Sequence, residues 1–212
     1  HMNELKDVCK KWNIPIVEDA AESLGSTYQS KPCGSLGELG VFSFNGNKIL
    51  TAGGGGAIVS QDKELLKLAK HLTTTAKINH PYEYVHDQIG YNFRMPNLNA
   101  ALLCAQLENL DFFVTRKRKQ ALELSDFFEG DGVKFRKELP NTMANYWLMC
   151  IELNDRVERD HFLKSTNNLG LMTRPIWKLI CDLPMYKDCY SDNQKNARYL
   201  EDRIVNIPSS VI

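Results

Sequence analysis

The sequence predicts an α/β fold organised in two units, and three observations support this prediction. Segments whose apolar residues recur at helical spacing alternate with short apolar runs that are typical of strands. Glycine-rich stretches separate several of these segments. The 212 residues are 43% hydrophobic and 25% charged, which provides enough apolar material for one good core or two small ones.

Composition also excludes several classes of function. The 26 basic and 26 acidic residues cancel, so there is no electrostatic case for a nucleic-acid partner or an acidic membrane. The apolar run 100–105 is far shorter than the roughly 20 residues that span a bilayer, and no leader-like segment opens the chain. The six cysteines show no metal-ligand spacing and are expected to be reduced thiols. We therefore expect a cytoplasmic protein without a metal site.

The elements of the first unit are predicted in chain order. Residues 3–12 have apolar positions at three- and four-residue spacing and should form a helix. A buried strand over 14–17 should follow and place Glu18 and Asp19 at its C-terminal tip, where open α/β sheets bind ligands. Residues 25–40 are expected to form loops and turns. Strands over 41–44 and 57–59 and a helix capped by Ser60 or Asp62 should come next.

The second unit is expected to begin along a long helix. The helical pattern runs for some thirty residues from Asn97, and its basic run 116–119 is interpreted as a solvated face. The sequence Gly130–Gly132 should end it. Strands near 134–136 and 146–153, a helix over 158–169 and an apolar run at 171–173 are predicted beyond this break. The predicted division assigns residues 1–112 to the first unit and 113–212 to the second.

A lysine and an aspartate stand where they can perform chemistry. Lys48 is expected to stand at the end of a buried strand and precedes the glycine run 53–56, and a half-buried amine of this kind can attack carbonyl groups. Asp19 is followed by two alanines, which leave room for a flat ring. Aspartate is the usual partner of the protonated pyridine nitrogen in pyridoxal phosphate enzymes. A lone lysine is more often solvent-facing, so the two residues carry the hypothesis together.

Four motifs resemble those of the DegT/StrS family of pyridoxal-phosphate-dependent sugar aminotransferases. They are VEDAAESLGS at 17–26, GVFSFNGNK at 40–48, GGGGAIV at 53–59 and GYNFRMPNLNAA at 90–101. Two further strings, HLTTTAK at 71–77 and MTRPIW at 172–177, are most similar to the branch that aminates nucleotide-linked 4-keto-6-deoxy sugars towards bacillosamine or legionaminic acid. The resemblance implies fold type I, with part of a large domain that has a mixed, mostly parallel sheet, and a small C-terminal α/β domain.

The resemblance also implies roles for individual residues. Lys48 matches the lysine that forms a Schiff base with the cofactor, Asp19 matches the partner of its ring nitrogen, and Ser43 matches a hydroxyl that binds its phosphate. Lysine at position 48 also argues against the dehydratase members, which have histidine there. Glu22 occupies a place beside the phenolic oxygen where relatives often have glutamine or histidine, so its role stays open.

The resemblance implies roles for two more residues, both in the motif at 90–101. Asn92 is similar to an asparagine that contacts the phosphate in the neighbouring subunit, which implies a homodimer with a shared active site. Arg94 matches a basic position near substrate or cofactor, and a structural ion pair is an equally weighted alternative.

The implied activity is transfer of an amino group from an amino acid, by resemblance L-glutamate, to a nucleotide-linked 4-keto-6-deoxyhexose for surface polysaccharide synthesis. Relatives have a substantial segment before the VEDAA motif and a closing helix, so the chain resembles a truncated fragment, and His1-Met2 resembles a cloning scar. We expect such a fragment to lack bound pyridoxal phosphate and to be inactive. Two alternatives remain open: a cofactor-free truncation, and a regulatory or binding offshoot of the fold.

Overall fold

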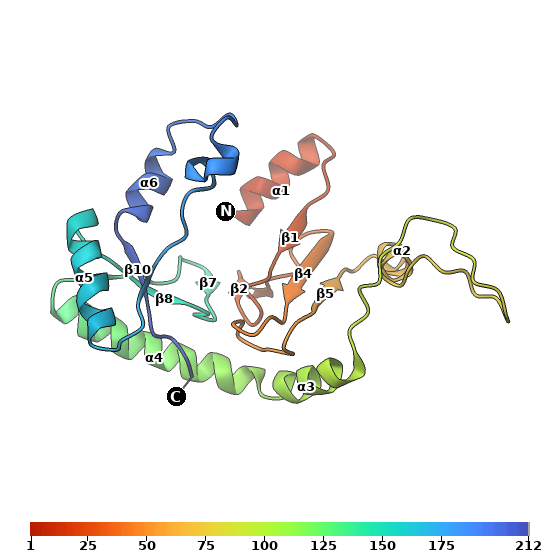
Figure 1. Cartoon of the computed structure of the whole chain (residues 1–212), viewed down its shortest axis with the longest axis horizontal. Helices are drawn as coiled ribbons and strands as arrows, with labels where there is room; N and C mark the ends of the chain where they lie inside the picture. The colour runs from red at the N-terminus through yellow and green to blue at the C-terminus, as the bar shows by residue number, and fades with distance from the viewer. Residues whose placement is uncertain (212) are drawn as a thin grey trace. The chain divides into compact units, whose positions relative to one another are not determined.

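The computed structural model describes residues 1–211, which form two compact units (Figure 1). The first unit comprises residues 1–114 and the short segment 139–145, and the second comprises residues 115–138 and the chain from Tyr146 onward. The segment 139–145 belongs to the first unit because the strand within it pairs with a strand near residue 27.

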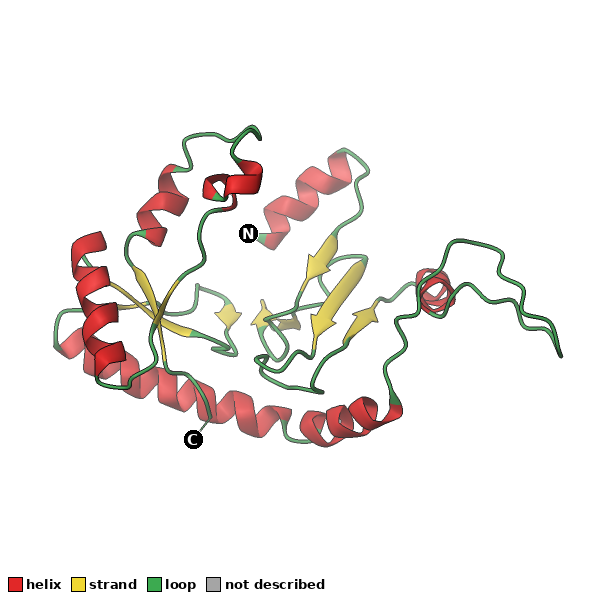
Figure 2. Ribbon diagram, in the orientation of Figure 1, coloured by secondary structure: helices red, strands yellow, loops and turns green. Residues whose placement is uncertain are grey.

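The first unit combines one helix at its start, two small sheets and two later helices (Figure 2). Its elements are α1 (Met2–Lys11), β1 (Val17–Asp19), β2 (Thr27–Tyr28), β3 (Lys31–Pro32), β4 (Leu39–Ser43), β5 (Gly56–Val59), α2 (Lys63–Thr73), α3 (Asn97–Leu107) and β7 (Thr142–Met143). Asp62 caps α2 as expected, since its carboxylate accepts hydrogen bonds from the N–H groups of Glu64 and Leu65.

The principal sheet of this unit has the order β1-β4-β5. β1 and β4 are parallel with Asp19 opposite Val41, whereas β4 and β5 are antiparallel. The sheet is therefore mixed, as expected, with one parallel and one antiparallel pairing. The antiparallel pairing follows from the connection between β4 and β5, which is a loop over 44–55 rather than a helical crossover, and only a crossover lets the next strand run parallel.

The strand predicted over 14–17 begins later than expected. The N–H of Ile16 donates to the Glu38 carboxylate at 2.5 Å instead of joining a ladder, and the ladder begins at Val17. Glu18 and Asp19 thus lie within the strand. The strand is also not fully buried, because Val17 is 61% exposed. The long helix expected from Asn97 is instead two helices, α3 and α4 (Leu110–Gly130), which are separated at residues 108–109.

Residues 74–93, here called the arm, extend away from the end of α2 (Figure 1). Antiparallel bridges join Thr74 to Asn92 and Lys77 to His86. The Nε2 atom of His71, in α2, lies 2.6 Å from the Oδ1 atom of Asp87. Gly90 packs against the backbone at the base of the arm, where a Cβ atom would come within 2.5 Å of the Ala76 nitrogen. The base of the arm is therefore closely packed.

The second unit is built around an antiparallel sheet with the order β6-β8-β10-β9. Its elements besides most of α4 are β6 (Lys134–Phe135), β8 (Met149–Glu152), α5 (Arg156–Asn168), β9 (Arg174–Pro175), two 3₁₀ turns (Ile180–Asp182 and Pro184–Tyr186), α6 (Lys195–Glu201) and β10 (Ile204–Ile207). Its core consists of the buried residues Ala121, Phe135, Met149, Ile151, Leu153, Val205 and Ile207.

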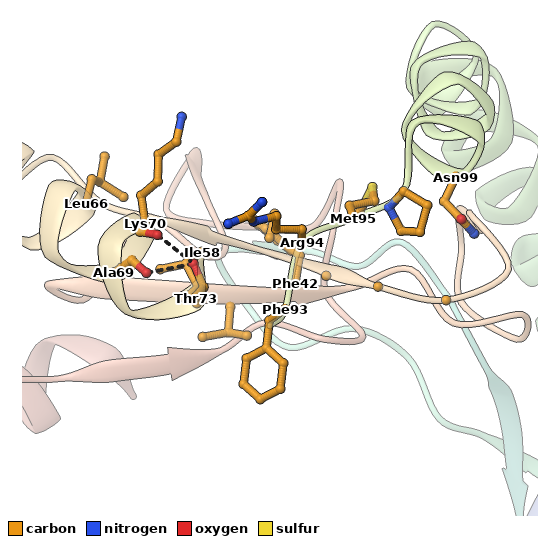
Figure 3. Close-up of a pocket in the computed structure, with 16 residues that line it drawn as sticks. Phe42, Ile58, Leu66, Ala69, Lys70, Thr73, Phe93, Arg94, Met95 and Asn99 are labelled. Carbon is orange, nitrogen blue, oxygen red and sulfur yellow. Dashed lines mark hydrogen bonds between the residues drawn. The ribbon is translucent and has the colours of Figure 1, made fainter. Parts of the chain in front are cut away.

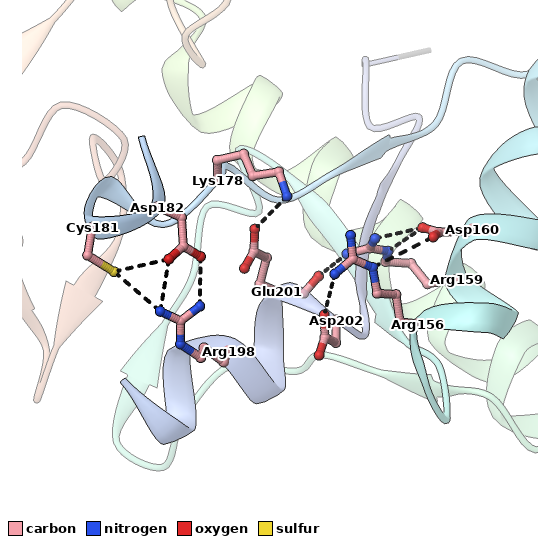
Figure 4. A network of polar contacts seen from close by, with 9 residues as sticks. All are labelled: Arg156, Arg159, Asp160, Lys178, Cys181, Asp182, Arg198, Glu201 and Asp202. Carbon is pink, nitrogen blue, oxygen red and sulfur yellow. Dashed lines mark hydrogen bonds and ion pairs between the residues drawn. The ribbon is translucent and has the colours of Figure 1, made fainter. Parts of the chain in front are cut away.

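Charged side chains connect α5, α6 and the first 3₁₀ turn of this unit (Figure 4). Arg198 pairs with Asp182 through two hydrogen bonds of 2.7 and 2.9 Å. Arg159 is only 7% exposed and donates to the backbone carbonyl of Glu201. Lys178 lies 3.3 Å from the Glu201 carboxylate. These contacts satisfy charges that the packing of the helices would otherwise leave without partners, so we interpret the network as structural.

Candidate active site

The candidate site lies where β1 and β4 end. Because the two strands are parallel, their carboxyl ends meet at one edge of the sheet, and this edge carries Asp19 on β1 and Ser43 on β4. The Asp19 carboxylate accepts a hydrogen bond of 3.1 Å from the N–H of Ala21, which begins the turn after β1. Residues predicted from separate motifs are thus brought to the same edge.

An ion pair between Lys48 and Glu22 occupies this edge. The Nζ atom of Lys48 donates to the Oε1 atom of Glu22 at 2.5 Å. The Lys48 side chain is 11% exposed, whereas the Glu22 side chain is 51% exposed. A shielded amine therefore contacts a carboxylate that faces water.

Lys48 lies in a loop rather than at the end of a strand, which corrects the expectation from the sequence. β4 ends at Ser43, and the hydrogen bonds of Phe44 with Gly55 and Ala52 then close the loop over 44–55. The backbone N–H of Lys48 donates to the carbonyl of Asn45 within this loop. The loop turns the chain back, so the amine reaches the turn that follows β1.

Asn145 supports this turn and is a residue that the sequence analysis missed. It is 4% exposed, and its Nδ2 group donates to the backbone carbonyls of Glu22 at 2.8 Å and Leu24 at 2.9 Å. Its own N–H donates to the hydroxyl of Ser26 at 3.0 Å. No local motif marks Asn145, because its partners lie about 120 residues earlier in the chain. A buried asparagine with several acceptors fixes the backbone that carries Glu22.

Only one of the two carboxylates at the strand tip belongs to the site. Successive side chains of a strand point to opposite faces, so Glu18 faces away from Asp19. Burial raises the pKa of Glu18, although a hydrogen bond with the backbone of Leu36 opposes this effect. Burial and the neighbouring Glu18 charge also raise the pKa of the Cys33 thiol. Glu18 is therefore part of the packing behind β1.

Asn92 and Arg94 lie apart from this cluster in the first unit. Asn92 pairs through its backbone with Thr74 at the base of the arm. The Nη2 atom of Arg94 donates to the backbone carbonyl of Thr74 at 3.2 Å. Four of the six sequence-predicted site residues, Asp19, Glu22, Ser43 and Lys48, thus gather at the carboxyl ends of β1 and β4, and two lie at the base of the arm.

A cavity of about 880 Å³ lies between β5, α2 and residues 93–96 (Figure 3). Its lining is largely apolar and includes the basic residues Lys70 and Arg94. None of Asp19, Glu22, Ser43 and Lys48 is among its lining residues. We assign the candidate site to the Lys48 cluster and not to this cavity, because an amine paired with a carboxylate can perform chemistry that an apolar cavity cannot.

Residues 1–211 contain no group of three His, Cys, Asp or Glu side chains that could bind a metal ion. Within the same residues, no helix has the length and apolar character needed to cross a membrane.

Comparison with known proteins identifies relatives along the whole chain. GDP-perosamine synthase of Escherichia coli O157:H7 is 35% identical over 211 residues, which cover 98% of this chain and 56% of that protein. A UDP-4-amino-4,6-dideoxy-N-acetyl-β-L-altrosamine transaminase of Campylobacter jejuni is 34% identical over 73% of this chain and 38% of its own length. The crystal structure of PseC, a Helicobacter pylori aminotransferase involved in the biosynthesis of pseudaminic acid, superposes with a TM-score of 0.90 at 23% identity, over 98% of this chain and 57% of that one.

The chain spans about half the length of the curated relatives it matches. The fold is that of solved DegT-family aminotransferases, with TM-scores of 0.88 and 0.90, which confirms the α/β, fold-type-I expectation. The aminotransferases of this group depend on pyridoxal phosphate. The model of the DegT/DnrJ/EryC1/StrS aminotransferase family matches residues 1–211, and the chain belongs to that family.

Proposed function

We propose that the protein is a pyridoxal-phosphate-dependent aminotransferase that transfers an amino group from L-glutamate to a nucleotide-linked 4-keto-6-deoxyhexose. The observation that carries the proposal is the shielded Lys48 amine, which lies 2.5 Å from the Glu22 carboxylate at the edge of the sheet that also carries Asp19. Two curated relatives bear names of nucleotide-sugar enzymes, which supports the substrate class. Carbon 4 of the sugar is the proposed acceptor position.

The functional groups of the site residues are suited to binding pyridoxal phosphate. Lys48 offers a primary amine for an aldehyde, Asp19 offers a carboxylate for a protonated ring nitrogen, and Ser43 offers a hydroxyl for a phosphate. When bound, pyridoxal phosphate supplies a carbonyl carbon for the amino group and a ring that withdraws electrons. The part of this chain is to hold the ring through Asp19 and to move protons through the Lys48 amine.

The first unit would then be part of the large cofactor-binding domain, and the second unit would be the small domain.

The apolar side chains of the arm support a further part of the proposal, a homodimer in which Asn92 serves the site of the second copy. Tyr82, Tyr84 and Ile89 are each more than 80% exposed, which is costly for apolar groups unless another surface covers them. The free state of all six cysteines supports a reducing, cytoplasmic location.

The test of the activity is spectroscopic and then enzymatic. Incubation of the full-length protein with pyridoxal phosphate should produce a yellow absorbance band that borohydride abolishes, and peptide mapping should place the reduced adduct on Lys48. L-glutamate together with a panel of nucleotide-linked 4-keto sugars should then give an amino sugar. An adduct on other lysines only would refute the assignment of Lys48, and failure to form any adduct would favour the non-catalytic alternative.

A further inference from the structure

The Lys48–Glu22 contact raises a question about proton transfer. An amine attacks a carbonyl carbon only as the neutral species, so Lys48 must lose a proton before it can react. Its side chain is 11% exposed, and water has little direct access to it. The Glu22 side chain contacts Lys48 at 2.5 Å and is itself 51% exposed. Glu22 therefore connects the shielded amine with solvent.

We propose that Glu22 is the proton acceptor and donor that enables Lys48 to form an imine with an aldehyde. This inference deepens the proposed function and rests on it for the identity of the natural aldehyde. It gives a reaction role to Glu22, whose role the family resemblance leaves open.

The proposed step balances in atoms and charge. Glu22 takes one proton from the Lys48 ammonium, and the nitrogen lone pair attacks the aldehyde carbon while the C=O π electrons move to oxygen. Glu22 returns its proton to that oxygen, a second proton moves from nitrogen to the same oxygen, and water leaves as the C=N bond forms. The ammonium and the aldehyde become a protonated imine and water, and Glu22 ends as a carboxylate.

The surrounding structure keeps Glu22 in place for this role. The turn that carries it begins with the Asp19–Ala21 hydrogen bond and is fixed by Asn145, which binds the Glu22 carbonyl at 2.8 Å. A buried anchor therefore fixes the backbone from which the Glu22 side chain reaches the amine.

The experiment measures imine formation with a probe that needs no cofactor site. The 212-residue chain is treated with acetaldehyde and cyanoborohydride, and mass spectrometry follows the rate at which Lys48 becomes N-ethyl-lysine. Glu22→Gln keeps the shape of the side chain but cannot take up the proton. General acid–base catalysis contributes at least about 100-fold, so the Lys48 rate should fall by about that factor. Circular dichroism checks that the variant is folded.

A second pair in the chain provides the matched control. Lys137 and Glu129 form an ion pair of 2.7 Å, and the hydrogen bond that the Lys137 amine donates to the Glu129 carboxylate raises the pKa of Lys137. Both side chains are well exposed, so water can take the proton and the carboxylate only favours the ammonium. Glu129→Gln should accordingly leave the Lys137 rate unchanged or increase it. A slower Lys48 reaction in Glu22→Gln, without a slower Lys137 reaction in Glu129→Gln, would distinguish proton transfer from simple charge pairing.

Chemical rescue separates a reaction role from a structural one. Acetate should restore at least a tenth of the lost Lys48 rate in Glu22→Ala, because a small carboxylate can enter the space that the side chain leaves. A Lys48 rate that is unchanged or faster in Glu22→Gln, or a slow rate that acetate does not restore, would overturn the inference. Parallel reactions of the full-length protein with pyridoxal phosphate test the proposed function separately, since failure there with a normal acetaldehyde result would refute only the cofactor assignment.

Discussion

Lys117, in the part of α4 that belongs to the second unit, offers a pH-dependent test of how this unit is packed. The residue is only 5% exposed, and its Nζ atom donates to the backbone carbonyl of Ser209. Burial disfavours the ammonium and lowers the pKa of Lys117 from 10.5 to about 8. We predict that Lys117→Met makes the stability of the protein less dependent on pH in this range.

The sign follows from proton binding in the two states. Between pH 8 and 10.5 the unfolded chain retains the Lys117 proton and the folded chain has lost it. The free energy of unfolding of the native protein should therefore rise with pH across this window. Each pH unit between the two pKa values corresponds to about 1.4 kcal/mol, so the full rise is on the order of 3 kcal/mol. Below pH 8 this amount is a constant cost of burying the charge.

Urea denaturation of both proteins at several values between pH 7 and 10.5 measures this effect. The native protein should gain up to roughly 3 kcal/mol relative to Lys117→Met as the pH rises. The difference between the two curves cancels the titration of cysteines and tyrosines. The variant also leaves the Ser209 carbonyl without its donor, which shifts its curve by about 1–3 kcal/mol at all pH values without changing the slope. Parallel curves across the window would refute the reasoning.

Three other substitutions test the site and the second unit. Asn145→Ala should destabilise the protein by roughly 1–3 kcal/mol in urea denaturation, whereas Asn109→Ala, which removes an exposed hydrogen bond, should cost less than about 1 kcal/mol. In the full-length protein, Lys48→Ala should leave the circular dichroism spectrum unchanged and abolish the borohydride-stable adduct with pyridoxal phosphate, and an adduct that persists would contradict its role. Hydrogen bonds from Lys134, Tyr199 and Arg136 lower the pKa of Glu152 despite its burial. The native protein should therefore lose stability as the pH falls below 4.5, and Glu152→Gln should lose less over the same range.

Local sequence signals predicted the elements that are marked by residues within or next to them. The helix over 63–73 was identified through its cap at Asp62, and the strand over 56–59 through its apolar run after the glycines. β10 was missed although it is an inner strand of the second sheet. Its pattern is four residues long, and it becomes a strand because it pairs with β8 some fifty residues earlier. Short strands of this kind depend on partners that a local window does not contain.

The same distinction applies to the candidate site. Motifs predicted Asp19, Ser43 and Lys48, and the parallel pairing of β1 with β4 brings Asp19 and Ser43 to one edge. Asn145 was not predicted, because its role arises only when segment 139–145 returns to the first unit. The position of Glu22 was predicted but its contact was not, since the loop over 44–55 had to close before the amine could reach it.

This closure also explains why a carboxylate at position 22 has chemical consequences. A residue in an open turn would form an exposed ion pair, which contributes little. Here Asn145 fixes the backbone of the turn, and the loop shields the Lys48 amine to 11% exposure while the Glu22 side chain stays half exposed. Glu22 therefore offers the shielded amine a hydrogen-bonded route for proton exchange with water. A glutamine in the same place would keep the hydrogen bond but lose the exchange, so the substitution separates binding of the amine from its activation.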